Sequence, residues 1–293
     1  MRRHLTFAAA CLTAAIILIA GSSTTPRAQT TGLMPVPSGA PSGPAPRLAN
    51  GKPDLTGVWQ KPYAPDMSRN GRGQQGYAEP PFAPNDPPAK REELRKAGNF
   101  AELPFTPAGL NDWKTYDPTD GDYTGNCLPF GLSRSINSPD PMQIMQSDKY
   151  IALLFEQNTW FNLIYTDGRE HPKNLDPTWF GHSVGKWDGD TLVVDTVGFN
   201  GWTRLDTIGH PHSDALHMIQ TFQRTDAGHI AYTVTVDDPK AYTKPWKNVR
   251  TLTLMNSELI EYSCEENNKD LRNGHIKFWE PPTTPKYPPT VVR

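Results

Sequence analysis

The feature that most constrains the fold is a long series of short β-type runs separated by tight turns. In each run apolar residues recur at every second position, and β-branched and aromatic residues are frequent. The expected strands are Met142 to Ser147, Tyr150 to Glu156, Thr159 to Thr166, Gly185 to Trp187, Thr191 to Val197, Ala215 to Arg224, His229 to Val236, Asn248 to Met255 and Glu258 to Cys264. Such a meander must protect its sheet edges, and closure into a barrel does so most simply. We therefore predict a mainly β protein, an antiparallel meander closed into a barrel.

The turns between these runs carry residues that suit hairpins. Asp188-Gly189-Asp190 separates two runs directly, and glycine tolerates the positive φ that a tight hairpin turn requires. Asp226-Ala227-Gly228 and Asn256-Ser257 separate two later pairs of runs. Neighbouring runs are therefore expected to pair as antiparallel hairpins.

The N-terminal half is expected to add one strand and two short helices. Pro53 to Gln60 is the expected first strand, and residues 61–140 form an extended and helical excursion from the barrel. Asp86 can cap a helix that runs through Lys90 to Lys96. Thr106, followed by Pro107, can begin a second helix. Both helices are too short to form a domain, so we expect them to brace the sheet.

The N-terminus has the order of a secretory signal peptide. A basic start is followed by an apolar run from Leu5 to Ala20 and then by small residues. We expect residues 1–28 to be this signal peptide, residues 29–50 to be a disordered linker rich in Pro, Gly and Ser, and residues 51–293 to form a single domain. The expected location is the periplasm or the cell exterior.

The charge and the cysteines narrow the classes of partner and compartment. The formal net charge is −2, which offers no basic footprint for nucleic acid or for anionic lipid. A small-molecule substrate or ligand is therefore expected, with no nucleic acid and no membrane partner after signal cleavage. Cys11 lies in the signal peptide, so Cys127 and Cys264 remain, and an even pair in an oxidising compartment predicts a disulfide.

Two resemblances add to this reading. Gly57-Val58-Trp59 on the first expected strand resembles the Gly-x-Trp entry of lipocalin-like barrels, which implies a lipocalin-like barrel with the tryptophan across its closed end. The chain from about Cys127 to Asn268 resembles a family of secreted bacterial β proteins of unassigned function. The matching segments are residues 179–185 (WFGHSVG), 189–196 (GDTLVVDT), 211–217 (PHSDALH) and 238–246 (DPKAYTKPW). This second resemblance implies export and a shared site, without a reaction.

One segment concentrates the residues that could carry chemistry. Between Gly181 and His217 lie His182, His210, His212 and His217, together with Asp195, Asp206 and Asp214. Imidazoles and carboxylates are the side chains that move protons or bind metals near neutral pH. We expect the stretch around His182 and the stretch around His212 to meet over a common hollow.

Three uses of this segment stay open. A metal site would take His182, His212 and His217, with Asp214 or Asp206 as an oxygen ligand, and would suit zinc, copper or iron. A metal-free site would pair His212 or His182 with Asp206 or Asp214 as an acid or base. Ser183 and Ser213 adjoin histidines, but neither lies in a Gly-x-Ser-x-Gly elbow. The third use is structural, with loop histidines bonded to main-chain carbonyls.

The aromatic residues near this segment suggest how a ligand could be held. Trp179, Trp202 and Tyr242 are the expected substrate-binding residues, because aromatic rings stack on sugars and aromatic ligands. The leading hypothesis is an exported enzyme that acts on a small organic or sugar-derived substrate by His/Asp acid–base chemistry, as a lyase, isomerase or hydrolase, with or without a metal. The alternatives are a non-catalytic lipocalin-like binding protein for an apolar or aromatic small molecule, and an envelope interaction module.

Overall fold

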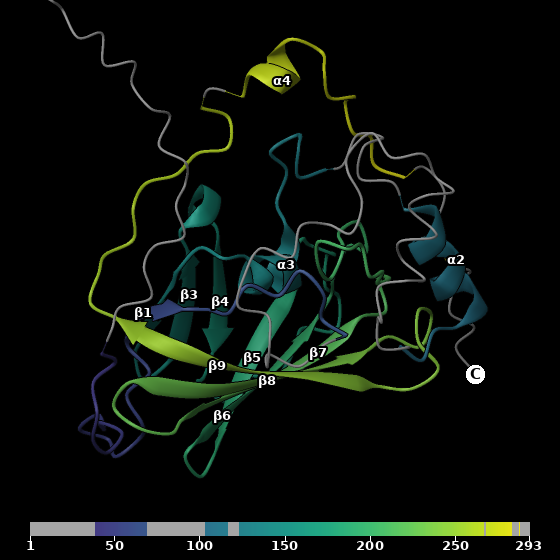
Figure 1. Ribbon diagram of the computed structural model, residues 1–293. Helices are drawn as coiled ribbons and strands as arrows, with labels where there is room; N and C mark the ends of the chain where they lie inside the picture. The colour runs from purple at the N-terminus through teal and green to yellow at the C-terminus, as the bar shows by residue number, and fades with distance from the viewer. Residues whose placement is uncertain (1–38, 69–102, 117–122, 267, 283–286, 288–293) are drawn as a thin grey trace, which may run out of the picture. The chain divides into compact units, whose positions relative to one another are not determined.

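Nine strands form a closed barrel in the part of the chain that the structure describes (Figure 1). The computed structural model describes residues 39–68, 103–116, 123–266, 268–282 and 287, all within the unit Val36–Arg293. The strands are β1 (Gly57–Gln60), β2 (Met142–Gln146), β3 (Tyr150–Phe155), β4 (Phe161–Tyr165), β5 (His182–Asp188), β6 (Thr191–Val197), β7 (His217–Arg224), β8 (His229–Asp237) and β9 (Trp246–Met255). The helical elements are α2 (Pro107–Thr115), α3 (Gly131–Asn137), the 3-10 turn η1 (Gln157–Thr159) and α4 (Lys269–Arg272). The predicted mainly β barrel is confirmed.

The order of the strands around the barrel follows the sequence, and β1 closes the ring by pairing with both β2 and β9. Among the described strands every neighbouring pair is antiparallel except β4 and β5, which run parallel. A ring with an odd number of strands cannot be antiparallel throughout, because the strand direction must return to its start after one circuit. The predicted antiparallel meander is therefore confirmed apart from the step between β4 and β5, which was not predicted. The connection at 166–181 carries the chain back to the starting end of β4.

The alternation of side chains separates an interior from an exterior face. In β8 the even-numbered residues from Ile230 to Val236 are buried, while the residues between them are partly exposed. Successive side chains of a strand point to opposite faces, so this pattern marks the barrel interior. Trp59 of β1 is fully buried in the same core, and its Nε1–H donates to the Leu55 carbonyl at 3.0 Å. Period-two alternation in the sequence is therefore matched by alternating burial in the barrel wall.

The second predicted helix is confirmed as α2. The Thr106 hydroxyl accepts a hydrogen bond from Gly109 N–H at 3.0 Å, and Pro107 occupies the first turn, where its missing N–H has no consequence. α3 was not predicted. The Ser133 hydroxyl of α3 donates to the Leu205 carbonyl at 2.8 Å, which attaches this helix to the loop between β6 and β7.

Some predicted segments cannot be compared and one differs. The predicted signal peptide and the predicted helix after Asp86 lie outside the described residues. Residues 39–50, the described part of the predicted linker, contact the barrel. Ala227 N–H donates to the Gly43 carbonyl at 2.9 Å, and Arg47 pairs with Asp190 at the β5–β6 turn. These contacts hold residues 39–50 against the barrel, so this part of the predicted disordered linker is ordered. The Pro- and Ser-rich composition gave no sign of the contacts.

The predicted strand Glu258 to Cys264 is wrong. β9 already pairs with β1, so no sheet edge remains beside it, and the chain after Met255 crosses outside the barrel. There Ile260 N–H donates to Glu156 Oε2 at 3.0 Å, and Ile260 is an exposed apolar side chain. Alternating apolar residues in this run are therefore not a sign of pairing.

The crossing segment ends in the predicted disulfide. Cys127 and Cys264 are bonded, with their Cα atoms 5.5 Å apart and a sequence separation of 137 positions. The bond joins the segment before α3 to the chain that leaves β9. It therefore restrains the two long excursions on either side of the strands β2–β9.

Replacing both cysteines with serine should destabilise the domain strongly. Closing a loop of 137 residues removes unfolded-state entropy worth about 5 kcal/mol in the chain-entropy model. We expect the double variant C127S/C264S to lose about this free energy of unfolding, measured by urea denaturation. A loss below about 1 kcal/mol would show that the excursions are held mainly by other contacts.

Lys61 is a cation buried beside the barrel. It follows β1 directly and is 1% exposed. Its Nζ donates to the Ser135 carbonyl at 2.9 Å and to the Ser138 hydroxyl at 3.1 Å, at the C-terminal end of α3. Burial lowers the pKa of Lys61 to about 7, although Asp140 and Glu156 act in the opposite direction. Its ordinary value is about 10.4.

The domain should therefore gain stability at alkaline pH because of Lys61. Between pH 7 and about 10 the unfolded chain binds more protons at this side chain than the folded chain, so the free energy of unfolding rises by up to roughly 1.4 kcal/mol per pH unit. Below pH 7 both states are protonated and the slope disappears. We expect the stability of wild type relative to Lys61→Met to rise over this window in denaturation experiments. An exposed-lysine variant, Lys186→Met, is the control, and a pH-independent difference for K61M would contradict the assignment.

Candidate functional site

A cluster of three histidines and one aspartate lies on the outer face of β5, β6 and β7. Ser183, Thr196 and Met218 are each buried in the barrel, so the preceding residues on their strands, His182, Asp195 and His217, point outward. His171 reaches the same place from the β4–β5 connection. We call His171, His182, Asp195 and His217 the outer histidine cluster.

The four side chains form one hydrogen-bonded chain. His171 Nδ1 and His182 Nδ1 are 2.8 Å apart, and His171 Nε2 lies 3.1 Å from Asp195 Oδ1. His217 Nε2 reaches the same carboxylate oxygen at 3.0 Å. An ionised carboxylate only accepts, so both Nε2 atoms donate to Asp195. Asp195 therefore holds two imidazoles at once.

This arrangement fixes the tautomers of the first two imidazoles. When neutral, His171 carries its proton on Nε2, where Asp195 accepts it, so its Nδ1 is an acceptor. His182 must then donate from Nδ1, which leaves the lone pair of its own ring on Nε2. No described residue forms a hydrogen bond with that Nε2 atom. The chain of bonds thus presents a basic nitrogen at its His182 end.

The local backbone and neighbouring side chains orient His182. Gly181 has φ +68°, and a Cβ at this position would lie 2.7 Å from the Val197 carbonyl oxygen. Glycine is required there because the chain must turn sharply into β5. Tyr165 of the parallel neighbour β4 stacks on the His182 ring with centroids 5.5 Å apart, and the Arg169 guanidinium lies 3.9 Å from the Tyr165 ring centroid.

The electrostatic surroundings keep His182 neutral near pH 7. Partial burial lowers the pKa of His182 below its ordinary value, and the nearby His171 and Arg169 lower it further. The cluster is also open to solvent, since the side chains of His171, His217 and Asp195 are 22%, 35% and 42% exposed. Neutral imidazole in an accessible position is the form that can accept a proton.

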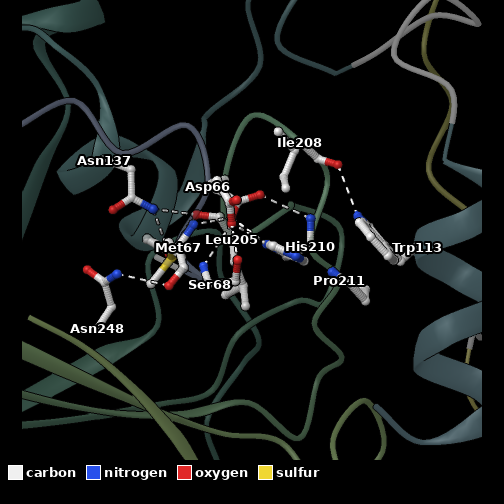
Figure 2. Close-up of polar contacts among 12 residues, drawn as sticks. Asp66, Met67, Ser68, Trp113, Asn137, Leu205, Ile208, His210, Pro211 and Asn248 are labelled. Carbon is white, nitrogen blue, oxygen red and sulfur yellow. Dashed lines mark hydrogen bonds and ion pairs between the residues drawn. The ribbon is translucent and has the colours of Figure 1, made fainter. Parts of the chain in front are cut away.

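A second His/Asp group is buried in the loop regions beside the barrel (Figure 2). Asp206 accepts three N–H donors: His210 Nδ1–H at 2.6 Å and Met67 N–H at 2.8 Å on Oδ2, and His210 N–H at 3.1 Å on Oδ1. Asp66 lies with one oxygen 4.0 Å from His210 Nδ1. Its Oδ1 accepts bonds from the Ser68 amide and hydroxyl. These contacts join the chain that follows β1 to the loop between β6 and β7.

Aromatic side chains close this group off from solvent. The Trp113 ring of α2 stacks on His210 with centroids 5.3 Å apart, and its Nε1–H donates to the Ile208 carbonyl at 3.1 Å, as Figure 2 shows. Gly209 has φ +85°, and a Cβ there would lie 1.9 Å from the Tyr116 ring. Glycine before His210 is thus needed for the aromatic cover to approach.

The buried group is the one place where the described residues bring three metal-ligand atoms together. Single ligand atoms of Asp66, Asp206 and His210 lie within 4.8 Å of one another. Two carboxylates and one imidazole are a donor set that suits zinc, iron or manganese. A metal ion would have to replace the existing bond between His210 and Asp206, and its enclosed position would give it a structural role. The predicted ligand set His182, His212 and His217 does not form such a group.

The structure separates the predicted catalytic residues. His182 and His217 share the outer histidine cluster, whereas His212 is 2% exposed and contacts the Thr203 hydroxyl at 2.6 Å and the Ser213 carbonyl at 3.0 Å. Asp206 belongs to the buried group. Asp214 forms a surface ion pair with Lys240 at 2.7 Å.

The two serines that adjoin histidines are engaged elsewhere. The Ser183 hydroxyl bonds with Thr196 at 2.8 Å inside the barrel, on the face opposite to its neighbour His182. The Ser213 hydroxyl donates to Asp238 at 2.8 Å. Each serine thus has a structural partner, and adjacency in sequence did not produce a nucleophile–base pair.

The predicted binding aromatics fall into two places. Trp179 and Trp202 meet edge to face with ring centroids 5.5 Å apart, and Trp279 lies 5.9 Å from each of them. Tyr242 is buried, and its hydroxyl donates to the Pro211 carbonyl at 2.9 Å. The first two therefore form an aromatic cluster near the surface, while Tyr242 supports the loop that carries His210.

Sequence reasoning missed His171 and did not choose Asp195 as a site residue. His171 lies in a connection of turn-forming residues with no strand pattern, so nothing local marks it. Asp195 interrupts the apolar run 191–197, and its outward direction follows from the burial of Val194 and Thr196. A charged residue on the outer face beside a histidine of the next strand was the available signal.

Comparisons with protein-family models, with curated protein sequences and with solved structures returned no match. In the described part of the chain, no helix has both the length and the apolar character needed to span a bilayer. The resemblances to lipocalin-like barrels and to the secreted family therefore stay predictions.

Replacing Asp206 with asparagine should destabilise the protein without touching the outer histidine cluster. The variant D206N removes the carboxylate charge to which His210 Nδ1–H and Met67 N–H donate. Breaking a buried pair in this way costs roughly 3–5 kcal/mol of the free energy of unfolding. The measurement is chemical denaturation. The matched control is D214N, which breaks an exposed ion pair worth at most about 1 kcal/mol. Equal effects of the two variants would argue against a structural role for the buried group.

Proposed function

We propose that the protein is an exported enzyme that acts on a small organic or sugar-derived substrate by acid–base chemistry at the outer histidine cluster. The observation that carries this proposal is the hydrogen-bonded chain from His182 through His171 to Asp195 and His217. A carboxylate on β6 that holds two imidazoles, one from β7 and one from the β4–β5 connection, in a position open to solvent suits proton transfer. The reaction class is that of a lyase, an isomerase or a hydrolase without a covalent intermediate.

His182 would act as the general base. Its Nε2 holds the lone pair, and its lowered pKa keeps the ring neutral near pH 7. His171 and Asp195 are positioning residues, since they act through His182 by fixing its tautomer and its ring direction. A proton accepted at His182 Nε2 places positive charge on this ring, while the Nδ1–H bond to His171 keeps the ring in position.

His217 would act as the general acid. Its Nε2–H is held by Asp195, so its Nδ1 is the atom that gains and releases the second proton. One proton removed by His182 and one delivered by His217 balance over a turnover, and no oxidant is needed. Elimination of water or an alcohol, isomerisation, and addition of water all have this form.

Proton transfer by a positioned side chain contributes about 10²- to 10⁴-fold to rate, so H182Q should lower kcat at least a hundredfold. The assay presents the purified protein with a panel of hydroxy acids, lactones, aryl esters and aryl glycosides. The matched control is H229Q, which removes another histidine paired with an aspartate, Asp226, at 2.9 Å on β8. If H182Q and H217Q turn over a substrate as fast as wild type does, the proposed site is wrong.

A second measurement tests the chain of bonds without a substrate. In an NMR titration, the pKa of His182 should lie below the ordinary histidine value of about 6.5. In the variant H171Q it should move upward, because the charge of His171 no longer opposes protonation. If the pKa of His182 is the same in H171Q as in wild type, the two imidazoles are not in contact and the proposed chain of bonds is wrong.

A further inference from the structure

The barrel interior contains buried polar side chains on six neighbouring strands, which together form a belt. It crosses β4 to β9 and consists of one inward-facing residue or pair per strand: Asn162, Ser183, Thr196, Gln220, Tyr232, Asn248 and Arg250, each at most 3% exposed. We call these residues the inner belt. Apolar residues line the rest of the interior. Burying polar groups costs free energy unless each finds a partner, so the pairing within the belt matters.

The part of the inner belt on β4 to β6 is internally satisfied. Asn162 donates to the Ser183 hydroxyl at 3.2 Å, and Ser183 bonds with Thr196 at 2.8 Å. Gln220 Nε2–H donates to the Tyr232 hydroxyl at 2.9 Å. The exceptions lie toward β9. Gln220 Oε1 has no hydrogen-bond partner, although the residue is fully buried.

Arg250 is the second and larger exception. Its Nε–H donates to Asn248 Oδ1 at 2.6 Å, but neither Nη1 nor Nη2 has a hydrogen-bond partner, and both atoms are buried. The Tyr232 ring, from the register partner on β8, lies 5.7 Å from the guanidinium carbon. Among the described residues no carboxylate forms a salt bridge with Arg250. An unpaired buried cation is one of the most costly groups in a protein.

We propose that the inner belt is a binding site for a small organic carboxylate that carries a hydroxyl group. The two terminal nitrogens of Arg250 form the planar fork that binds a carboxylate in a bidentate manner. Gln220 Oε1, which reaches the belt next to the Tyr232 hydroxyl, is an acceptor that requires a donor on the ligand. A carboxylate alone would satisfy Arg250 only, whereas a hydroxycarboxylate satisfies both.

The inner belt is separate from the outer histidine cluster. Ser183 and Thr196 belong to the belt, while their neighbours His182 and Asp195 face the other side of the same strands. The inner belt can therefore be tested with variants that leave the outer histidine cluster intact. The two proposals succeed or fail independently.

The test measures the thermal shift and the heat of binding of full-length protein with glycolate, acetate, ethylene glycol and chloride at equal ionic strength. Glycolate should raise Tm by a few degrees and more than acetate, while ethylene glycol and chloride should not, since only a ligand bound to the folded state stabilises it. Equal shifts from acetate and chloride would overturn the proposal.

Variants assign the two halves of the ligand. R250M should abolish the shifts from both acids, and R250K should weaken them because it keeps the charge but loses the fork. Q220L should remove the preference for glycolate over acetate and retain the acetate shift. The surface control R272M should behave as wild type.

Without any carboxylate, R250M should change Tm in the opposite direction from its effect with glycolate bound. Removing an unpartnered buried charge should raise Tm above that of wild type, and saturating glycolate should reverse this order. If R250M lowers Tm under both conditions while circular dichroism shows it folded, Arg250 is satisfied within the protein and the proposal fails.

Discussion

The parity of the barrel is the constraint on which the site depends. Nine strands close only if one neighbouring pair is parallel, and that pair is β4 and β5. A parallel step cannot be made by a tight turn, so a connection of 16 residues at 166–181 returns along the barrel before β5 begins. This connection brings His171 to the outer face. Without it, His182 would have no imidazole neighbour and Asp195 would hold His217 alone.

The pleat of the sheet gives the same strands two chemistries. Along β5 and β6, each outward residue of the histidine cluster is followed by an inward residue of the polar belt, as with His182 and Ser183. The outer face is accessible to solvent and suits proton transfer. The inner face is shielded from water, so a charge there costs free energy unless a partner neutralises it. A change of one residue in strand register would exchange the two sets, so register is under strong constraint.

The sequence predicted the strands well because alternation and turn chemistry are local signals. The hairpin at Asp188-Gly189-Asp190 is an example, since β5 ends and β6 begins on either side of a glycine with φ +57°. The parallel step, the false strand after Met255 and the position of His171 depend on how the ring closes, and no local pattern contains that information.

The site was predicted only in part for the same reason. His182 and His217 lie in strands, so their faces follow from period two, and both belong to the outer histidine cluster. His212 lies in the loop between β6 and β7, where its direction is set by Thr203 and Ser213. Asp206 likewise pairs with His210, its neighbour four positions along this loop. Histidines that lie close together in the sequence therefore do not all meet in the folded protein.

The pairing of β1 with β9 bears on how the chain reaches its native state. Residues 57–60 leave the ribosome long before residues 246–255, yet each strand completes the other's hydrogen bonding. Contacts so distant in sequence form slowly, because the chain must lose the entropy of closing a long loop before the contacts can stabilise it. In the interval β8 has an open edge that could pair with another chain. Assembly of this barrel should therefore favour dilute conditions, and chains that end before residue 246 should aggregate.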